Sequence, residues 1–544
     1  MDTEKVNPAS KPPEISAIGK EPAVQAKPPQ YEQAIKHTDN KTLNYLVVRL
    51  LYRTKWFRFI LAAVSGLLLM ISFPPLGYGL FGWVALVPLL IAIYTSPTQR
   101  TAGLCGLIAG VVFYSISLSF LIDVFEFIGF VFANILSIYL ALFSVSVWLA
   151  ASKIGLRRSF ILIPFFWTGI EFFRSESYQL KFSWLSLGYS QSPYLTLIQV
   201  CDLIGVYGLT FLIVTVNALI AWFFLKYIRK LKWSFTHPVI AALILFIILI
   251  YGMTRESYLP KHLRADQPKG IPVVAVQEWI GSVDRYVKST SEVTDGKEET
   301  LVVWPEASLY DVFKDSVQLD ALKTLVKEKK IYLVFGTIER TEEQVRVNNY
   351  AVLMGPDGQV IGKYAKRVPV PFLEAVVRPG NEWGAFDTPL GKIGIFICYE
   401  SGFTRISRWL VVAKGAELFV APTQELAGWG GLSHRHHATI APFRAIETRR
   451  AIVRPTSLGI SQIIHPSGRI EGEIGYLASG VLRSEVPRST QLTWYVKYGY
   501  FFPKFCLWIY SGFILIWIVL SLINYFRVCC INLHNVYILW LYPG

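Results

Sequence analysis

Hydrophobic residues gather into long runs in two parts of the chain. Most of these runs approach the roughly 20 apolar residues that an α-helix needs to cross a bilayer core. Seven lie in the first half of the chain, and one lies far downstream. They cover residues 57–73, 80–95, 102–122, 127–151, 159–173, 203–225, 236–252 and 505–524. This pattern predicts a polytopic α-helical membrane domain of about eight transmembrane helices.

Between the seventh and eighth runs, the pattern changes to short β-rich segments separated by turns and helical stretches. The segments include "IPVVAVQ", "TLVVWPE", "IYLVFGTI" and "KIGIFICYE", and "VQLDALKTLVKEKK" predicts an amphipathic helix. The sequences "GPDG" and "HPSG" are typical of hairpin turns. Strands mixed with helices predict a separate α/β sandwich domain.

The two patterns together define the expected organisation of the chain. The start of the chain is polar and proline-rich, which is typical of a disordered tail. It contains no early apolar segment, so we expect the first spanning helix to serve as the targeting signal. We predict a basic tail over 1–54, seven helices over 55–252, a linker over 253–270, the α/β domain over 271–490, a last helix over 500–525 and a tail over 526–544.

Composition and charge support a membrane protein. The chain is 53% hydrophobic and only 17% charged, with a mean hydropathy of +0.41. Its net charge of +15 does not indicate nucleic-acid binding, because Lys and Arg flank the apolar runs instead of forming one basic domain. Basic connections stay in the cytoplasm. Their positions predict that both termini are cytoplasmic and that residues 253–500 are outside.

Three polar residues stand at or just beyond the ends of predicted strands. Glu306 follows "TLVVWP", Lys366 lies in "GKYAKRVPVPF", and Cys398 follows "GKIGIFI". A thiol needs a base and a nearby cation to attack a carbonyl at neutral pH. Glu306 suits the base, and Lys366 suits the cation that stabilises the developing oxyanion. Each also has a structural interpretation: a turn carboxylate, a solvated lysine and a buried cysteine that fills space.

Two other sets of residues were considered for metal binding or redox chemistry. The remaining five cysteines show no metal-site spacing and are interpreted mainly as small core residues. His434, His436 and His437 form an H-x-H-H sequence, which we expect to lie in a loop without paired acids. We therefore predict no metal site.

Longer motifs connect these residues to a known family. "WPEAS" (304–308), "YAKRVPVPFLE" (364–374) and "ICYES" (397–401) follow the order of the Glu–Lys–Cys nitrilase superfamily. "FPPLGYGLFGWVALVPLL" and "FSWLSLGYSQSP" are similar to membrane-domain signatures, and the segment 434–470 is similar to a late catalytic motif. Over about residues 55–525 the chain resembles the apolipoprotein N-acyltransferases, the membrane-embedded branch of that superfamily.

The resemblance implies a role for each site residue. Glu306 is expected to be the general base, Lys366 the oxyanion-stabilising cation and Cys398 the nucleophile. Supporting roles are expected for the backbone amide of Tyr399 in holding the oxyanion, for Glu374 and Glu400 as acids that orient Lys366 or line the pocket, and for Asn349 as a structural side chain.

The resemblance also implies a reaction and its partners. Cys398 would take an acyl chain from a phospholipid as a thioester, and the α-amine of a diacylglyceryl-cysteine apolipoprotein would accept it. No cofactor is needed, because the thioester keeps the acyl group activated. We expect a monomer in the bacterial inner membrane, with its catalytic domain on the periplasmic side.

Two alternatives belong to other functional classes. The first is a membrane-anchored amide hydrolase that uses the same triad and needs a water-accessible pocket. The second is a transporter with an outer binding domain. A translocation path usually contains buried paired charges, and Glu126 and Glu171 near the ends of apolar runs do not form an evident pair in the sequence. The triad favours acyl transfer over both.

Overall fold

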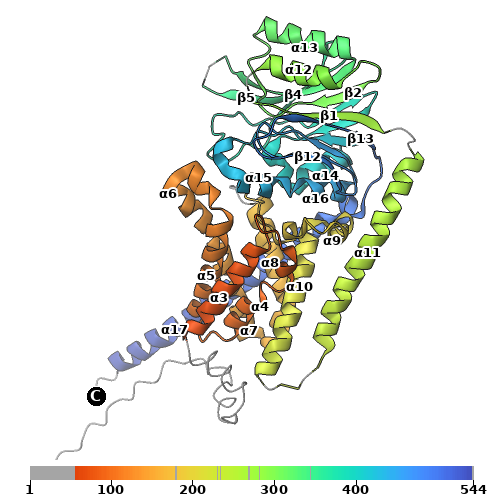
Figure 1. Cartoon of the computed structure of the whole chain (residues 1–544). Helices are drawn as coiled ribbons and strands as arrows, with labels where there is room; N and C mark the ends of the chain where they lie inside the picture. The colour runs from red at the N-terminus through yellow and green to blue at the C-terminus, as the bar shows by residue number, and fades with distance from the viewer. Residues whose placement is uncertain are drawn as a thin grey trace, which may run out of the picture.

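The computed structural model describes residues 55–541, except 178–180, 230, 233, 267–269, 281 and 343–344. The tail predicted over 1–54 lies outside the described residues. A bundle of helices makes up one end of the molecule, and an α/β sandwich makes up the other (Figure 1). The two-part organisation expected from the change in hydrophobic pattern is therefore present.

The helical domain contains the first part of the chain and one long helix from its end. Its helices are α3 (Lys55–Ile71), η1 (Gly79–Trp83), α4 (Val87–Tyr94), α5 (Gln99–Ser117), α6 (Phe120–Ile135), α7 (Ser137–Ile154), α8 (Leu156–Phe172), η2 (Phe173–Ser177), η3 (Leu187–Gln191), α9 (Leu195–Ile198), α10 (Cys201–Ile228), α11 (Thr236–Asp266), η6 (Tyr495–Gly499) and α17 (Phe501–Leu541).

Among the described residues, five helical stretches are long and apolar enough to cross a membrane, by length and composition. They are Gln99–Ser117, Phe120–Ile154, Cys201–Ile228, Thr236–Glu256 and Tyr495–Arg527. The other three predicted spans form shorter helices, namely α3, η1 with α4, and α8. These five stretches make the chain a membrane protein, and the count of eight spans stays a prediction.

The run at 127–151, expected as a single span, is divided between two helices. Its first part belongs to α6, which lies at the side of the bundle below the α/β domain, and the rest forms α7 (Figure 1). Within α6, Glu126 has a positive φ of 52°, which kinks the helix. The kink lies just before the run, and the backbone stays helical at Leu136 between α6 and α7, so residues 127–151 belong to the one stretch Phe120–Ile154.

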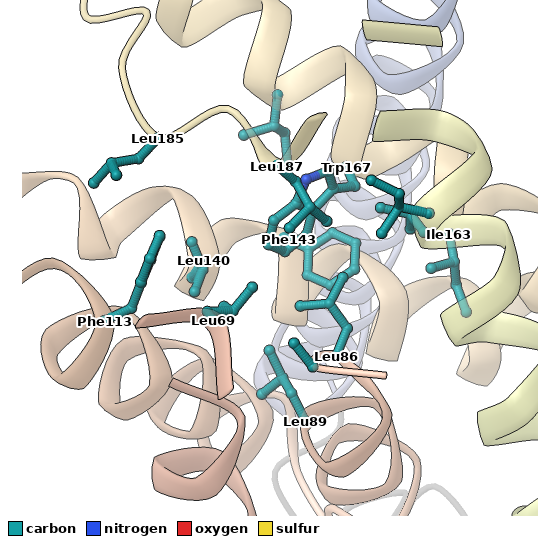
Figure 2. Close-up of a cluster of buried hydrophobic side chains, with 14 of the residues drawn as sticks. Leu69, Leu86, Leu89, Phe113, Leu140, Phe143, Ile163, Trp167, Leu185 and Leu187 are labelled. Atoms are coloured by element: carbon teal, nitrogen blue, oxygen red, sulfur yellow. The ribbon is translucent and has the colours of Figure 1, made fainter. Parts of the chain in front are cut away.

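Small residues allow the helices of the bundle to approach closely. A Cβ atom on Gly66 of α3 would lie 2.5 Å from the carbonyl oxygen of Ala109, and one on Gly106 would lie 2.3 Å from that of Leu140. Such contacts between backbones are typical of helix packing in membranes. Around them, large apolar side chains from α3, α4, α5, α7 and α8 fill the centre of the bundle (Figure 2).

The α/β domain contains two sheets. One has the strand order β13-β1-β2-β4-β5-β6, with β3 paired to β4, and the other has the order β12-β11-β10-β9-β8-β7. Their strands are β1 (Ile271–Gln277), β2 (Thr300–Val303), β3 (Leu309–Tyr310), β4 (Ile331–Arg340), β5 (Val347–Met354), β6 (Val360–Ala365), β7 (Gly384–Thr388), β8 (Gly391–Ile395), β9 (Leu418–Val420), β10 (Ile452–Arg454), β11 (Ser461–Ile464), β12 (Ile470–Ile474) and β13 (Gly480–Val486).

The two sheets form a sandwich that carries helices on both outer sides. Val273 and Leu301 of one sheet share a buried core with Ile393 and Val420 of the other. Helices α12 (Val283–Val293) and α13 (Ser316–Lys329) cover the side away from the bundle (Figure 1). Helices α14 (Thr404–Val412), α15 (Gly430–Ala438) and α16 (Ala441–Thr448) lie between the sandwich and the bundle. This is the predicted α/β sandwich.

Two segment boundaries differ from the prediction. The segment expected as a linker, 253–270, is helical through Asp266, because α11 continues well past residue 252. The segment expected as a tail, 526–544, is helical through Leu541 as part of α17. Both helices therefore continue past the drop in hydrophobicity that suggested these boundaries.

The two domains are joined by buried polar contacts as well as by apolar packing. Phe443 of α16 lies in the core of the helical domain, with its ring 5.0 Å from that of Tyr189. Asp202 of α10 accepts hydrogen bonds from Arg449, which follows α16, at 2.6 Å and from Arg255 of α11 at 2.7 Å. Asp202 and Arg449 are both almost fully buried. The carboxylate therefore ties two helices of the helical domain to the α/β domain.

We predict that Asp202→Asn destabilises the protein by about 3 kcal/mol, because removing one partner leaves a buried guanidinium without its counter-charge. Thermal unfolding of the full chain in detergent measures this. The matched control is Asp320→Asn, which removes an exposed carboxylate 3.6 Å from Lys323 and should not change the melting temperature. Equal melting temperatures for the two variants would contradict the role of Asp202.

Candidate active site

The three predicted site residues follow strands that lie near each other in the sandwich. Glu306 comes three residues after β2, and Lys366 comes directly after β6. Strand β8 ends at Ile395, two residues before the position expected from the sequence. Cys398 is nevertheless held at the sheet, because its N–H donates to the carbonyl of Pro422 at 3.0 Å. Cys398 then begins the short helix η4 (Cys398–Gly402).

Lys366 is held in the site by two carboxylates. Its Nζ donates to Glu306 Oε1 and to Glu374 Oε1, both at 2.8 Å, and its side chain is only 1% exposed. Asn349 Nδ2 also donates to Glu306 Oε1 at 2.7 Å. A buried ammonium requires such partners, since a charge without them is costly away from water. The sequence predicted that Glu306, Lys366, Glu374 and Asn349 belong to one site. In the structure these four residues lie in contact.

The main chain of Gln424 connects the nucleophile candidate with the base candidate. Its N–H donates to Glu306 Oε2 at 2.8 Å, and its carbonyl oxygen lies 3.7 Å from Cys398 Sγ. Gln424 follows β9, the neighbour of β8 in the second sheet. Gln424 therefore lies between the Cys398 thiol and the Glu306 carboxylate. Lys366 bonds the other oxygen of that carboxylate, Oε1.

The surroundings of Cys398 favour the neutral thiol. Burial, followed by the negative charge of Glu306, raises the pKa of the Cys398 thiol well above its usual value, against the opposing effect of Lys366. Burial lowers the pKa of Lys366, but Glu306, Cys398 and Glu374 outweigh it and raise that pKa. The resting site thus combines a protonated thiol, a charged ammonium and an adjacent carboxylate.

Glu400 organises the backbone around this site. Its Oε1 accepts the N–H groups of Arg367 at 2.7 Å and Val368 at 3.1 Å, and its Oε2 accepts that of Ile397 at 2.7 Å. The hydroxyl of Tyr364 donates to both oxygens. Glu400 therefore ties the segment after Lys366 to the segment before Cys398. It does not bond Lys366 directly, whereas Glu374 does.

Tyr399 connects the site with the helical domain. Its hydroxyl donates to the carbonyl of Lys181 at 2.6 Å, and its ring packs edge-on against Phe403 with centroids 5.1 Å apart. Its side chain therefore faces the membrane-domain segment that carries the "FSWLSLGYSQSP" motif. The role expected for its backbone amide stays a prediction.

An apolar cavity of about 170 Å³ leads from Cys398 towards the helical domain. Side chains of α6 form one side of it, and the segment 370–373 forms another. The rings of Phe132 and Phe372 stack across these two walls with centroids 5.1 Å apart. Trp184, Tyr399 and His437 complete the lining near the sulfur. Such a cavity suits a long hydrocarbon chain more than a polar substrate.

The three histidines were placed wrongly in a loop. They lie on helix α15, and His437 does have an acidic partner, because its Nδ1 donates to Glu425 Oε1 at 2.7 Å. His434 contacts the carbonyl of Leu426, and His436 contacts that of Ser117. The three side chains thus meet separate partners. Within the described part of the chain, His, Cys, Asp and Glu side chains form no group suited to a metal ion.

Sequence reasoning missed Glu425 and the cavity lining on α6. Glu425 lies a few residues past the end of β9, in the same context as Glu306 and Cys398, so the strand-end pattern contained a signal for it. The α6 residues carried no such signal. Their apolar character was explained equally well by a membrane span.

Comparison with known proteins agrees with this architecture. Residues 65–219 match the apolipoprotein N-acyltransferase N-terminal domain family, and residues 275–494 match the carbon-nitrogen hydrolase family. The apolipoprotein N-acyltransferase of Geobacter metallireducens is 31% identical over 82% of this chain and 93% of its own length. That of Chlorobaculum tepidum is 25% identical over 82% of this chain and 94% of its own length.

The fold and the family matches together define a membrane protein of the nitrilase superfamily, in which a carbon-nitrogen hydrolase domain is joined to a helical membrane domain. Within that class, the chain belongs to the apolipoprotein N-acyltransferase family. The resemblance found in the sequence motifs is thereby confirmed.

We predict that alkylation of Cys398 by iodoacetamide accelerates with increasing pH beyond pH 9 without a plateau near neutrality. The reason is that the raised pKa keeps the thiol protonated, and the thiolate is the reacting form. Mass spectrometry of the Cys398 peptide over time measures the rate at each pH. A plateau near pH 7 would show a stabilised thiolate and contradict the prediction.

Proposed function

We propose that this chain transfers a fatty acyl chain from a membrane phospholipid to the α-amine of a diacylglyceryl-cysteine apolipoprotein. The observation that supports it most is the apolar cavity that leads to Cys398 beside the buried pair of Glu306 and Lys366. Membership of the apolipoprotein N-acyltransferase family supports the same reaction. The roles of the individual residues are our inference from chemistry and contacts.

In the first half-reaction, Glu306 takes the thiol proton of Cys398, and the sulfur attacks the ester carbonyl of the phospholipid. The negative charge on the carbonyl oxygen is stabilised by Lys366 and by the N–H of Tyr399. An ammonium has three N–H donors. Within the described part of the chain, two of them bond Glu306 and Glu374, so the third is left for the substrate.

The intermediate then collapses with loss of the glycerol oxygen. The carbon–oxygen ester bond breaks, and the departing oxygen takes the proton held by Glu306. The products are a lysophospholipid and an acyl thioester on Cys398. Each proton and bonding pair is accounted for, so the step balances without a metal, nucleotide or redox partner.

In the second half-reaction, the apolipoprotein amine attacks the thioester carbonyl. Glu306 accepts a proton from the amine as the new amide bond forms, and that proton returns to sulfur as the carbon–sulfur bond breaks. The same oxyanion donors serve both steps, because both pass through a tetrahedral intermediate at one position. The cavity favours lipid substrates and disfavours hydrolysis, since its lining around Cys398 is mostly apolar.

The proposal includes a location for the protein. The basic connections support an enzyme in the bacterial inner membrane, with residues 271–490 on the periplasmic side. Glu306, Lys366 and Cys398 all come from one chain, so the proposed site is complete in a monomer.

We predict that wild-type protein incubated with phospholipid carries an acyl group on Cys398 that neutral hydroxylamine releases. Cys398→Ala should abolish it. Glu306→Gln should slow its formation by roughly 10²-fold or more, because the amide cannot take the thiol proton. Intact-protein and peptide mass spectrometry measure the adduct. Tyr310→Phe is the matched control, because Tyr310 is exposed on β3 and lies outside the cavity. A labile acyl chain on Cys398→Ala would refute the mechanism.

The proposed topology makes a separate prediction. A reporter fused after Ile280 should be active only outside the cytoplasm, and a reporter fused after Arg527 should be active only inside. The asymmetry of basic residues between alternate connections is the reason. Activity of both reporters on the same side would contradict the eight-span arrangement, because it would leave no span between the two fusion points.

A further inference from the structure

His437, Glu425 and Arg454 form a buried network behind the nucleophile. His437 Nδ1–H donates to Glu425 Oε1 at 2.7 Å, and Arg454 Nη2 donates to the same oxygen at 2.8 Å. All three side chains are at most 3% exposed. Burial raises the pKa of Glu425, but Arg454 and His437 outweigh it and lower the pKa to about 2. The carboxylate therefore stays charged and fixes the orientation of the imidazole.

The Nε2 atom of the His437 imidazole faces η4, the short helix that begins with Cys398. His437 Nε2 lies 3.0 Å from Ser401 Oγ and 3.2 Å from the carbonyl oxygen of Cys398. Since Nδ1 carries a proton, Nε2 accepts the Ser401 hydroxyl in the neutral ring and donates to the Cys398 carbonyl in the charged ring. Burial, followed by the positive charge of Arg454, lowers the pKa of His437, so the ring is neutral and its Nε2 accepts the hydroxyl of Ser401 in η4.

This turn needs external support, because its first residue has an unfavourable backbone conformation. Cys398 has a φ of +51°, in the left-handed region that residues with a Cβ rarely adopt. Such conformations cost of order 1–3 kcal/mol and persist only when the surroundings hold them. His437 contacts the turn at Ser401, and Glu400 accepts the N–H of Ile397 just before it.

The carbonyl that His437 faces belongs to the peptide with the proposed oxyanion donor. The carbonyl of Cys398 and the N–H of Tyr399 are parts of one planar peptide unit and point in opposite directions. Ser401 lies in the same short helix as this peptide, so the bond from its hydroxyl to His437 holds the turn and with it the direction of the N–H. A stacked ring of Trp184, 5.4 Å away at an interplanar angle of 24°, restrains the imidazole from the helical domain.

We propose that His437 is a positioning residue for acyl transfer: oriented by Glu425, it fixes the Cys398–Tyr399 peptide so that the Tyr399 N–H faces the developing oxyanion. The inference rests on the proposed function, because it assigns a purpose to that N–H only if Cys398 is the nucleophile. Of the three histidines on α15, His437 is the one that contacts η4, since His434 and His436 contact the carbonyls of Leu426 and Ser117.

The test compares His437→Asn, His437→Gln and His437→Ala in the full-length protein. An Asn amide ends near the position of Nδ1 and keeps the bond to Glu425, whereas a Gln amide reaches the position of Nε2 and can meet both Ser401 and the Cys398 carbonyl. The rate of acyl-enzyme formation is measured in single turnovers with a fluorescent phosphatidylethanolamine in micelles. His436→Gln, the same substitution one residue earlier, supplies the baseline for a polar replacement on α15.

We expect His437→Ala and His437→Asn to slow acylation on the order of 10²-fold, the size expected from a small misplacement of the reacting geometry. The acylation rate of His437→Gln should stay near that of His436→Gln. The KM for the phospholipid should not change in any of the variants. Alkylation of Cys398 by iodoacetamide should proceed at the wild-type rate in all of them, because displacement of iodide develops no oxyanion.

Three results would overturn the positioning role. They are equal rates for the Asn and Gln variants, a wild-type acylation rate in His437→Ala, or parallel losses of alkylation and acylation. The last result would show a general disturbance of the site. None of them resembles failure of the proposed function, which would appear as a labile acyl chain on Cys398→Ala.

Discussion

A lysine ammonium buried away from water is the constraint on which the rest of the site depends. An isolated charge in such a place costs several kcal/mol, so Lys366 requires carboxylates on two sides, and Glu306 and Glu374 provide them. Those carboxylates in turn need donors, which come from Asn349 and from the main chain of Gln424 and Val370. The contacts that neutralise the charge of Lys366 thereby fix the carboxylate of Glu306, the proposed base.

The helical domain completes the site instead of only anchoring it. The cavity has walls from α6 and from residues 182–184 on the membrane side, and from the segment 370–373 on the catalytic side. Tyr399 bonds the carbonyl of Lys181 across the same boundary. A soluble sandwich alone would leave this end of the site open to water. The arrangement thus lets a hydrocarbon chain reach the sulfur while remaining in apolar surroundings.

Much of this could be predicted from the sequence, because it depended on local pattern. Polar residues at strand ends, together with the family motifs, indicated Glu306, Lys366 and Cys398, and the apolar runs indicated the helices. The kink at Glu126 within α6 could not be found, since neither Gly nor Pro stands at it. The pairing of His437 with Glu425 was also hidden, because it depends on how a helix packs against a strand end and not on periodicity.

The tie at Asp202 has a consequence for biogenesis. Ribosomes make the chain from its amino terminus, so Asp202 is made long before Arg449, which follows it by 247 residues. Arg255 follows Asp202 by only 53 residues and bonds the same oxygen at 2.7 Å. The carboxylate can therefore be neutralised within the nascent helical bundle while the catalytic domain is still being made. Arg449 then joins an ion pair that already exists, and docking of the catalytic domain begins on a prepared surface.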